Sequence, residues 1–183
     1  RPDNWRGKFE VDVKQDTLSI IIKERTKFFK FGLFDKSPAL YVHLPEMDLT
    51  SLQIQSTNGD LLLQDLTISE VEIKTTNGDI ELNSISSPDI QINTTNGDME
   101  LDSIISKSVH LQTVNGDFYL DEIEGDIHAE TTNGDLTLRT ATLDRSIQIG
   151  TTNGDIDIYT DEQPTNVLFD IKTNNGDVKV FGS

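Results

Sequence analysis

Apolar and polar residues alternate along most of the chain in a unit that recurs seven times. Each unit contains the tripeptide Asn-Gly-Asp, with apolar residues six and four positions before its Asn and one and three positions after its Asp. Alternation with a period of two is typical of a strand with one buried face, so the sequence predicts two short strands per unit. The tripeptides begin at Asn58, Asn77, Asn96, Asn115, Asn133, Asn153 and Asn175, at intervals of 19, 19, 19, 18, 20 and 22 residues.

Most units also carry an apolar residue six positions after the Asp, where we expect a further contribution to the core. The residues at this position are Leu66, Ile85, Ile104, Ile123 and Ala141.

Two architectures are compatible with this alternation. Asn-Gly between alternating segments is a strong hairpin signal, which allows an antiparallel meander. The regular period favours a parallel β-solenoid, because a solenoid stacks equivalent residues above one another at about 4.8 Å and so explains the recurrence of one tripeptide. We therefore expect an all-β fold: a single right-handed parallel β-solenoid, or β-helix, with coils of about 19 residues over 51–183. The right hand follows from the usual chirality of parallel crossovers.

Residues 1–50 lack the repeat but also alternate, as in Phe9, Val11 and Val13 or in Leu18, Ile20 and Ile22; Leu40, Val42 and Leu44 continue the pattern. An open solenoid end exposes unpaired strand edges. We expect this segment to form an N-terminal β cap that is continuous with the solenoid.

The composition fits a narrow stack of coils. Only 34% of the 183 residues are hydrophobic, and the formal net charge is −17. A surface of this sign repels phosphates and excludes a general nucleic-acid binder. The charge is unevenly divided, because residues 1–36 hold nine Lys/Arg and six Asp/Glu whereas residues 37–183 hold six and 26.

The chain has no cysteine, which excludes disulfides, cysteine-zinc sites and thiol nucleophiles. No apolar run approaches the roughly 18 residues that span a bilayer, and the first ten residues do not resemble a signal peptide. Because the sequence starts at Arg1, we expect a fragment whose targeting or anchoring segment lies outside it.

The recurrent TTNGD units resemble the DUF4097 family of bacterial adhesin-type β-strand-repeat domains, which includes YvlB-like proteins. The motif is intact around Asn77, Asn96, Asn133 and Asn153, and the resemblance covers about residues 50–183. It implies a β-helical, non-catalytic domain of the bacterial envelope, in some cases associated with envelope-stress systems.

The aspartates of the tripeptides are the first candidate site. Stacked carboxylates about 5 Å apart repel by about 0.8 kcal/mol even in the dielectric of water, so something must offset the repulsion. In the interpretation we favour, each Asp accepts N–H groups of its own turn while Asn has a positive φ and Gly follows. The alternative is a row of Ca²⁺ ions, which need six to eight oxygens each. The column comprises Asp60, Asp79, Asp98, Asp117, Asp135, Asp155 and Asp177, and the expected turns comprise Asn58, Gly59, Asn77, Gly78, Asn96, Gly97, Asn115, Gly116, Asn133, Gly134, Asn153, Gly154, Asn175 and Gly176.

Two outward columns offer further candidates. The residue before each Asn is usually Thr, and a flat row of outward-facing threonines resembles an ice-binding surface. The outward column next to it is mixed and charged, which does not favour ice binding. Thr is also simply a good strand residue. His110 and His128 occupy equivalent positions in adjacent coils, and we expect a solvated pair, because zinc takes three or four protein ligands.

The N-terminal cap contains a dense basic and aromatic segment. Its structural role would be to plug the end of the solenoid with phenylalanines. Its functional alternative is docking on anionic lipid or polymer, where aromatic rings insert and cations meet head groups. The segment comprises Lys27, Phe28, Phe29, Lys30, Phe31 and Phe34.

Catalytic motifs are absent from the sequence: it contains no GxSxG, HExxH, P-loop or GxGxxG pattern. An arginine, Arg139 or Arg145, near Asp135 and Asp144 resembles the charged lining of the catalytic groove in a carbohydrate-active β-helix. A fold alone, however, does not imply a chemistry. We expect no enzyme and no cofactor.

The sequence thus predicts a rigid acidic display or binding domain at the bacterial cell envelope or surface, although the cytoplasmic face is also compatible. Its repeated rungs suit multivalent contacts with an envelope polymer or protein surface. The runner-up is a membrane-docked envelope-stress sensor that uses residues 27–34, followed by a carbohydrate-active enzyme. End-to-end association through Val178 to Phe181 is a further expectation.

Overall fold

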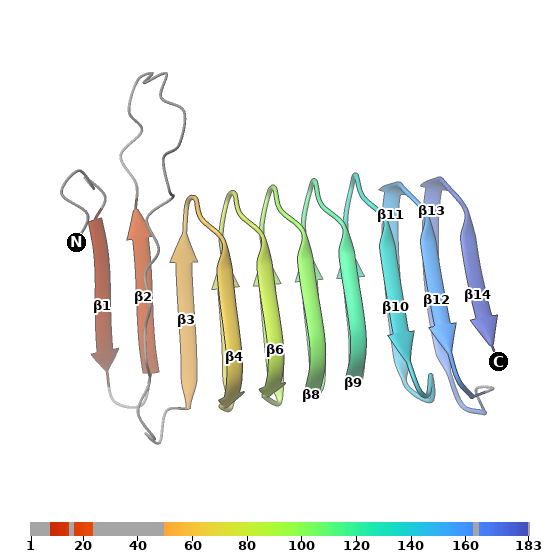
Figure 1. Ribbon diagram of the computed structural model, residues 1–183, viewed down its shortest axis with the longest axis horizontal. Coiled ribbons are helices and arrows are strands. Elements are labelled where there is room, and N and C mark those ends of the chain that lie inside the picture. Colours follow the sequence, from red (N-terminus) through yellow and green to blue (C-terminus); the bar gives the residue numbers. More distant parts are fainter. Residues whose placement is uncertain (1–7, 15–16, 24–49, 163–164, 183) are drawn as a thin grey trace.

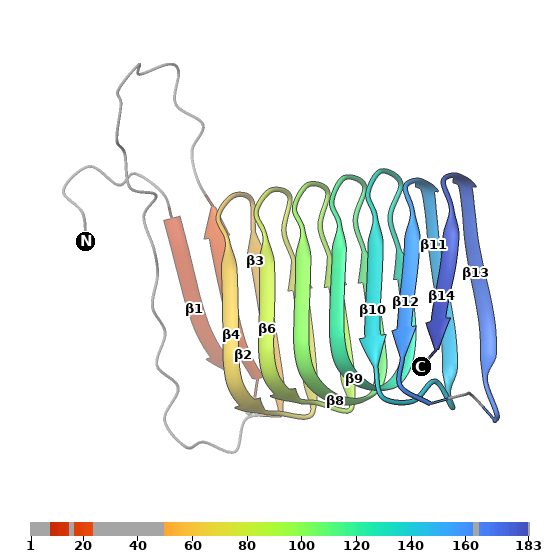
Figure 2. The same ribbon diagram turned by 45° about the vertical axis from the view of Figure 1, so that its right-hand side comes forward.

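The computed structural model describes residues 8–14, 17–23, 50–162 and 165–182, and within these ranges the regular elements are all β-strands (Figure 1). In this part of the chain there is no helix able to cross a bilayer. The strands form one continuous 14-stranded sheet that wraps into two opposed layers (Figure 2).

Each coil contributes one strand to each layer, which we call face A and face B. Face A contains the strand that precedes each Asn-Gly-Asp corner: β3 (Ser51–Ser56), β5 (Glu70–Lys74), β7 (Asp89–Asn93), the second halves of β8 (Met99–Gln112) and β9 (Phe118–Glu130), β11 (Ser146–Asn153) and β13 (Leu168–Asn175). Face B contains the strand that follows the corner: β4 (Leu61–Thr67), β6 (Ile80–Ser86), the first halves of β8 and β9, β10 (Leu136–Thr140), β12 (Ile156–Thr160) and β14 (Val178–Gly182).

Successive coils pair in parallel and in register, which confirms the solenoid and excludes the hairpin meander. Ile73 of β5 lies opposite Ile54 of β3 on one side and Ile92 of β7 on the other, so equivalent residues of the repeat stack directly. The right hand of the coil stays a prediction from the general chirality of crossovers.

The core lies between the two faces and consists of the apolar columns predicted from the alternation. Ile73, Leu82, Ile92, Leu101 and Leu138 are completely buried, as are most of their equivalents in the interior coils. Burial of an aliphatic side chain stabilises a fold by about 1.5–3 kcal/mol, so the columns supply the main stabilisation of the stack.

One predicted core position is wrong. Ala141, at the sixth position after Asp135, is exposed, and Leu143 two residues later is fully buried instead. In the four preceding coils the fifth position after Asp has a positive φ, which turns the chain so that the sixth position points inward; these residues are Asp65, Ser84, Ser103 and Glu122. The fifth coil lacks this left-handed residue and therefore turns its corner later.

At the N-terminal end, β1 (Lys8–Lys14) and β2 (Thr17–Lys23) form an antiparallel pair, and β2 continues face A by pairing in parallel with β3. Leu18 lies opposite Leu52 and Ile20 opposite Ile54, so this segment is in register with the repeat. The strand expected at residues 40–44 lies outside the described residues.

Candidate functional site

The Asn-Gly-Asp corner carries a continuous ladder of side-chain amides. Asn96 Nδ2 donates to Asn77 Oδ1 at 2.8 Å, and Asn115 Nδ2 donates to Asn96 Oδ1 at the same distance. The same bond joins every neighbouring pair from Asn58 to Asn175, at 2.7–2.8 Å. Each interior Asn therefore donates to the coil before it and accepts from the coil after it, so its side chain joins three coils.

Glycine is required at the corner because the backbones of neighbouring coils nearly touch there. A Cβ atom on Gly116 would lie 2.0 Å from the carbonyl oxygen of Gly97, and the φ of Gly116 is +156°. The positive φ thus falls on Gly. The expectation of a positive φ at Asn is wrong, because none of these asparagines has one.

The aspartates are bonded between coils rather than within a turn. Asp98 Oδ1 accepts the backbone N–H of Asp117 at 2.8 Å, and Asp117 Oδ1 accepts that of Asp135 at 2.8 Å. The aspartates therefore accept backbone N–H groups as predicted, but the donor belongs to the next coil and not to the same turn. This bond recurs from Asp60 to Asp177 and offsets the repulsion along the column.

The donor set of the aspartate column does not favour the calcium interpretation. One oxygen of each carboxylate up to Asp155 is engaged by a backbone N–H. Among the described residues no group of three or more His, Cys, Asp or Glu side chains is arranged to hold a metal ion.

Sequence reasoning missed the role of the first Thr of the TTNGD motif. Thr131 and Thr151 point inward and are buried, and their hydroxyls donate to Gly116 and Gly134 carbonyls of the preceding coil at 3.2 and 3.0 Å. In the earlier coils the equivalent Thr94 and Thr113 hydroxyls donate to the Asn carbonyl of their own corner. Extending the inward–outward alternation by one more step, from four to two positions before the Asn, would have placed this Thr inside.

Acidic residues are more numerous on one outer surface of the solenoid than on the other. The outward columns of face B, with the corner aspartates beside them, hold twelve acidic and two basic residues: Asp60, Asp79, Glu81, Asp98, Glu100, Asp102, Asp117, Asp121, Asp135, Asp155, Asp157 and Asp177, with Arg139 and Lys179. The outward columns of face A hold six acidic and two basic residues: Glu70, Glu72, Asp89, Asp126, Glu130 and Asp170, with Lys74 and Lys172. Both faces are therefore acidic, and face B with its corner aspartates is the more strongly acidic of the two.

A hollow of about 390 Å³ lies on the acidic face at the N-terminal coils, and its lining includes Asp60, Asp79, Asp98, Glu81 and Glu100. Tyr119 also lines it. The carboxylate of Asp117 raises the pKa of the Tyr119 phenol most, with contributions from partial burial, Asp98 and Asp135. A negative potential disfavours the negatively charged phenolate, and it therefore raises the pKa of the phenol.

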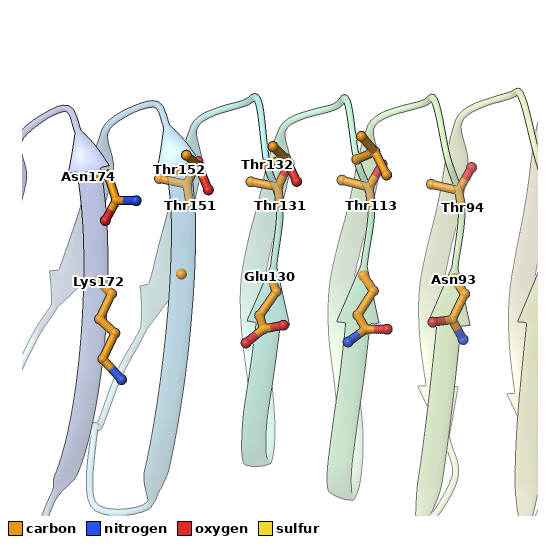
Figure 3. A pocket seen from close by; sticks show the side chains of 13 residues that line it. Asn93, Thr94, Thr113, Glu130, Thr131, Thr132, Thr151, Thr152, Lys172 and Asn174 are labelled. Carbon is orange, nitrogen blue, oxygen red and sulfur yellow. The ribbon is translucent and has the colours of Figure 1, made fainter.

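Face A has a larger open groove, of about 540 Å³, lined by polar side chains near the corner (Figure 3). Thr132 and Thr152 lie at its upper rim, with Glu130 and Lys172 below them on different strands (Figure 3). Gly150, in the outward column between Glu130 and Lys172, contributes no side chain, which deepens the groove at this coil.

The two histidines are neighbours, as predicted. The rings of His110 and His128 lie 5.4 Å apart and are tilted by 46°. His128 Nδ1 lies 3.1 Å from Gln148 Oε1, and His128 Nε2 lies 3.6 Å from Glu130 Oε1. The pair belongs to the polar surface of face A.

Arg139 and Arg145, the candidates for a catalytic groove, make other contacts. Arg139 stacks over the Tyr159 ring, with its guanidinium carbon 5.4 Å from the ring centre. Arg145 donates to Thr140 Oγ1 at 2.9 Å, and its burial lowers the pKa of the guanidinium, against the opposing effect of Glu124. Asp144 accepts three hydrogen bonds from Thr165 and Asn166, which lower its pKa.

The basic and aromatic segment Lys27, Phe28, Phe29, Lys30, Phe31 and Phe34 lies outside the described residues. Both its plugging role and its docking role stay predictions.

The stacked corners and the two in-register faces define a β-solenoid repeat protein. The chain belongs to the Toastrack (DUF4097) family, whose family model matches residues 3–182. This match confirms the resemblance drawn from the TTNGD units and extends it over the N-terminal strands. No curated protein and no solved structure matches the chain.

Proposed function

We propose that the chain is a non-catalytic binding and display domain of the bacterial cell envelope, with an adhesin-like role. Face B is the contact surface, and its ligand is a basic polymer segment or the basic surface of a partner protein. The family and the solenoid fold are consistent with a binding domain.

The observation that carries this proposal is the placement of charge on face B. Glu81 lies opposite Glu100 in the next coil, and Asp102 lies opposite Asp121, so carboxylates recur at the strand spacing of about 4.8 Å. The raised pKa of the Tyr119 phenol agrees with a negative potential over this surface. A long surface of one sign attracts ligands of the opposite sign and accelerates their encounter.

The repeat also determines how such a surface reaches a useful affinity. An individual exposed ion pair contributes at most about 1 kcal/mol, so a single basic group binds weakly. A ligand with several basic groups converts later contacts into intramolecular ones, and its affinity rises with its length. The rigid register of the coils keeps the carboxylates in one line and lowers the entropy cost of these contacts.

Titration with lysine oligomers of increasing length tests the proposal. The test variant combines Glu81→Gln, Glu100→Gln, Asp102→Asn and Asp121→Asn on face B. The matched control removes the same charge from exposed acids elsewhere, with Glu70→Gln, Asp89→Asn, Glu124→Gln and Glu162→Gln.

We expect the affinity of the native chain to increase with oligomer length and to fall steeply with salt, because exposed charges are screened within about 10 Å at 0.1 M ionic strength. The face B variant should lose at least tenfold in affinity for the long oligomer, and the control should lose much less. Equal losses in both variants would show that net charge alone drives binding and would refute a contact surface on face B.

A further inference from the structure

The open groove on face A follows the long axis of the solenoid. Its lining comes from the corner ends of successive face A strands, from β7 through β8, β9 and β11 to β13 (Figure 3). Because neighbouring strands lie about 4.8 Å apart, the groove crosses several strands within its volume of about 540 Å³. This shape suits an elongated ligand that lies across the strands.

The backbone at the floor of the groove is already paired. The Thr113 N–H donates to the Glu130 carbonyl at 3.0 Å, and the Thr131 N–H donates to the Gly150 carbonyl at 2.9 Å. An extended peptide that adds to a sheet needs unpaired backbone donors and acceptors. The groove therefore offers a ligand its side chains, and a peptide strand gains no backbone hydrogen bonds at these positions.

The side chains beside this floor have free hydrogen-bonding groups. Gln112 is exposed and Asn93 is half-buried, and Thr132 and Thr152 lie at the rim (Figure 3). None of these four side chains has a hydrogen-bond partner within the described part of the chain. The corner asparagines differ, because their own ladder occupies them. A carboxamide and a hydroxyl can each donate and accept, so the groove fits a ligand whose groups also do both.

The groove has balanced charge. Among its lining residues Glu130 and Lys172 are the charged ones, and Gly150 separates them in one column. The chain as a whole has a net charge of −17 and repels anions. The balanced lining therefore favours an uncharged polar ligand over an anionic or a strongly cationic one.

Gly150 leaves an opening in the groove that the fold does not require. A Cβ atom on Gly150 would lie 3.8 Å from its nearest neighbour, the Lys172 carbonyl oxygen, which is an ordinary contact. At the corner residue Gly116 the corresponding distance is 2.0 Å. The backbone therefore requires glycine at position 116 and not at position 150, and the missing side chain at 150 leaves room for a ligand beside Glu130.

We propose that this groove binds a linear, uncharged saccharide chain, a ligand distinct from the basic one proposed for face B. Sugar hydroxyls donate and accept hydrogen bonds, as the carboxamides of Asn93 and Gln112 do, and the Glu130 carboxylate accepts from them. An extended β-linked chain advances by a similar length per sugar as the solenoid does per coil, about 4.8 Å, so successive sugars meet equivalent positions. Val114 is 43% exposed where most coils have Thr, and it provides an apolar contact for the C–H groups of a sugar ring.

Calorimetric titration of the full chain with cellobiose, cellotetraose and cellohexaose, and with the corresponding N-acetylglucosamine oligomers, tests the proposal. We expect at least one series to bind, with an affinity that rises with chain length and levels off once the groove is filled. Binding should change little between low and high salt, because the ligand carries no charge. The face B variant should bind the sugars as the native chain does, so the two proposed sites are tested independently.

Removal of the two carboxamides tests the contacts. Asn93 and Gln112 lie opposite one another in adjacent coils, and Asn93→Ala combined with Gln112→Ala should weaken binding of the longest oligomer by about tenfold, the loss expected for two neutral hydrogen bonds. The matched control is Gln64→Ala combined with Asn83→Ala, because these residues form the corresponding carboxamide pair on face B. The control should bind the sugar as the native chain does.

A side chain at position 150 tests the location of the site. Gly150→Gln places an uncharged side chain where a sugar would lie and should weaken binding by about tenfold or more. Ser146→Gln, at the other end of the same strand β11 and outside the groove lining, is the matched control and should leave binding unchanged.

Absence of binding in both sugar series would overturn the proposal. Equal weakening by the groove variants and their controls would also overturn it, since this result assigns the sugar to another surface, and so would a steep loss of binding in high salt. If the double carboxamide variant does not fold, as judged by circular dichroism, the comparison of Gly150→Gln with Ser146→Gln decides alone.

Discussion

Asn115 Nδ2 donates a 2.8 Å hydrogen bond to Asn96 Oδ1, and this bond joins side chains 19 residues apart in the sequence. Asn115 Oδ1 in turn accepts from Asn133 Nδ2. The asparagine of the motif is thus a connector between coils, in addition to being a turn residue.

The ladder should make an interior asparagine more important than a terminal one. Asn115→Ala removes two side-chain bonds and should lower the free energy of unfolding by about 1–2 kcal/mol. Asn175→Ala removes only the bond to Asn153 and should cost about half as much. Denaturant unfolding of both variants measures the difference; equal effects would contradict a ladder that acts across coils.

The close approach of neighbouring glycines predicts a strong asymmetry between two Gly→Ala substitutions. Gly116→Ala should destabilise the chain by about 3 kcal/mol or more, because its Cβ would overlap the Gly97 carbonyl and its φ is unfavourable for Ala. Gly150→Ala, whose Cβ would lie 3.8 Å from its nearest neighbour, should be neutral or stabilising by about 0.5–1 kcal/mol. Thermal unfolding of the two variants compares them directly.

The negative potential of face B should be visible in the titration of Tyr119. Its folded-state pKa is raised above the ordinary value, chiefly by Asp117, so the phenol should ionise at higher pH than a free tyrosine. Its contribution to stability is complete below the ordinary pKa near 10 and is lost as pH rises through the folded value. Ultraviolet difference titration against Tyr119→Phe isolates this group. Asp117→Asn or high salt should bring its pKa down, and no change under either condition would contradict the assigned cause.

Asp144 should stabilise the segment around Thr165 in a manner that depends on pH. Hydrogen bonds from Asn166 and Thr165 lower its folded-state pKa, so its contribution is present above the ordinary carboxyl pKa and is lost as pH falls through the folded value. Asp144→Asn should therefore be less stable than the native chain at neutral pH and approach it at acid pH. Unfolding curves across this range test the prediction. Asp89→Asn, at an exposed carboxylate at the start of β7, is the matched charge-removal control.

The solenoid and its register were predictable because the repeat imposes them. Leu52, Val71 and Ile90 occupy one column only if coils of equal length stack in parallel, and the alternation alone determines which side chains face inward. The corner was less predictable, since its hydrogen bonds run between coils. Local turn chemistry therefore suggested a positive φ at Asn and an Asp bond within the turn, and the structure has neither at the described corners.

Other features depended on geometry that a linear pattern does not encode. The left-handed residues Asp65, Ser84, Ser103 and Glu122 are all polar but include no Gly or Asn, so their backbone conformation leaves little trace in the sequence. The replacement of Ala141 by Leu143 in the core follows from the loss of that turn. The higher density of acids on face B emerges only when the columns are assigned to two opposite surfaces.

The direction of the hydrogen bonds has a mechanical consequence. The Asn amide bonds, the Asp carboxylate bonds and the backbone bonds between strands all join one coil to the next along the solenoid. Tension applied along the rod loads these rungs in series, so we expect coils to open one after another. A load across the rod is shared by many rungs in parallel. We therefore expect the molecule to resist force applied across the rod more strongly than force applied along its axis.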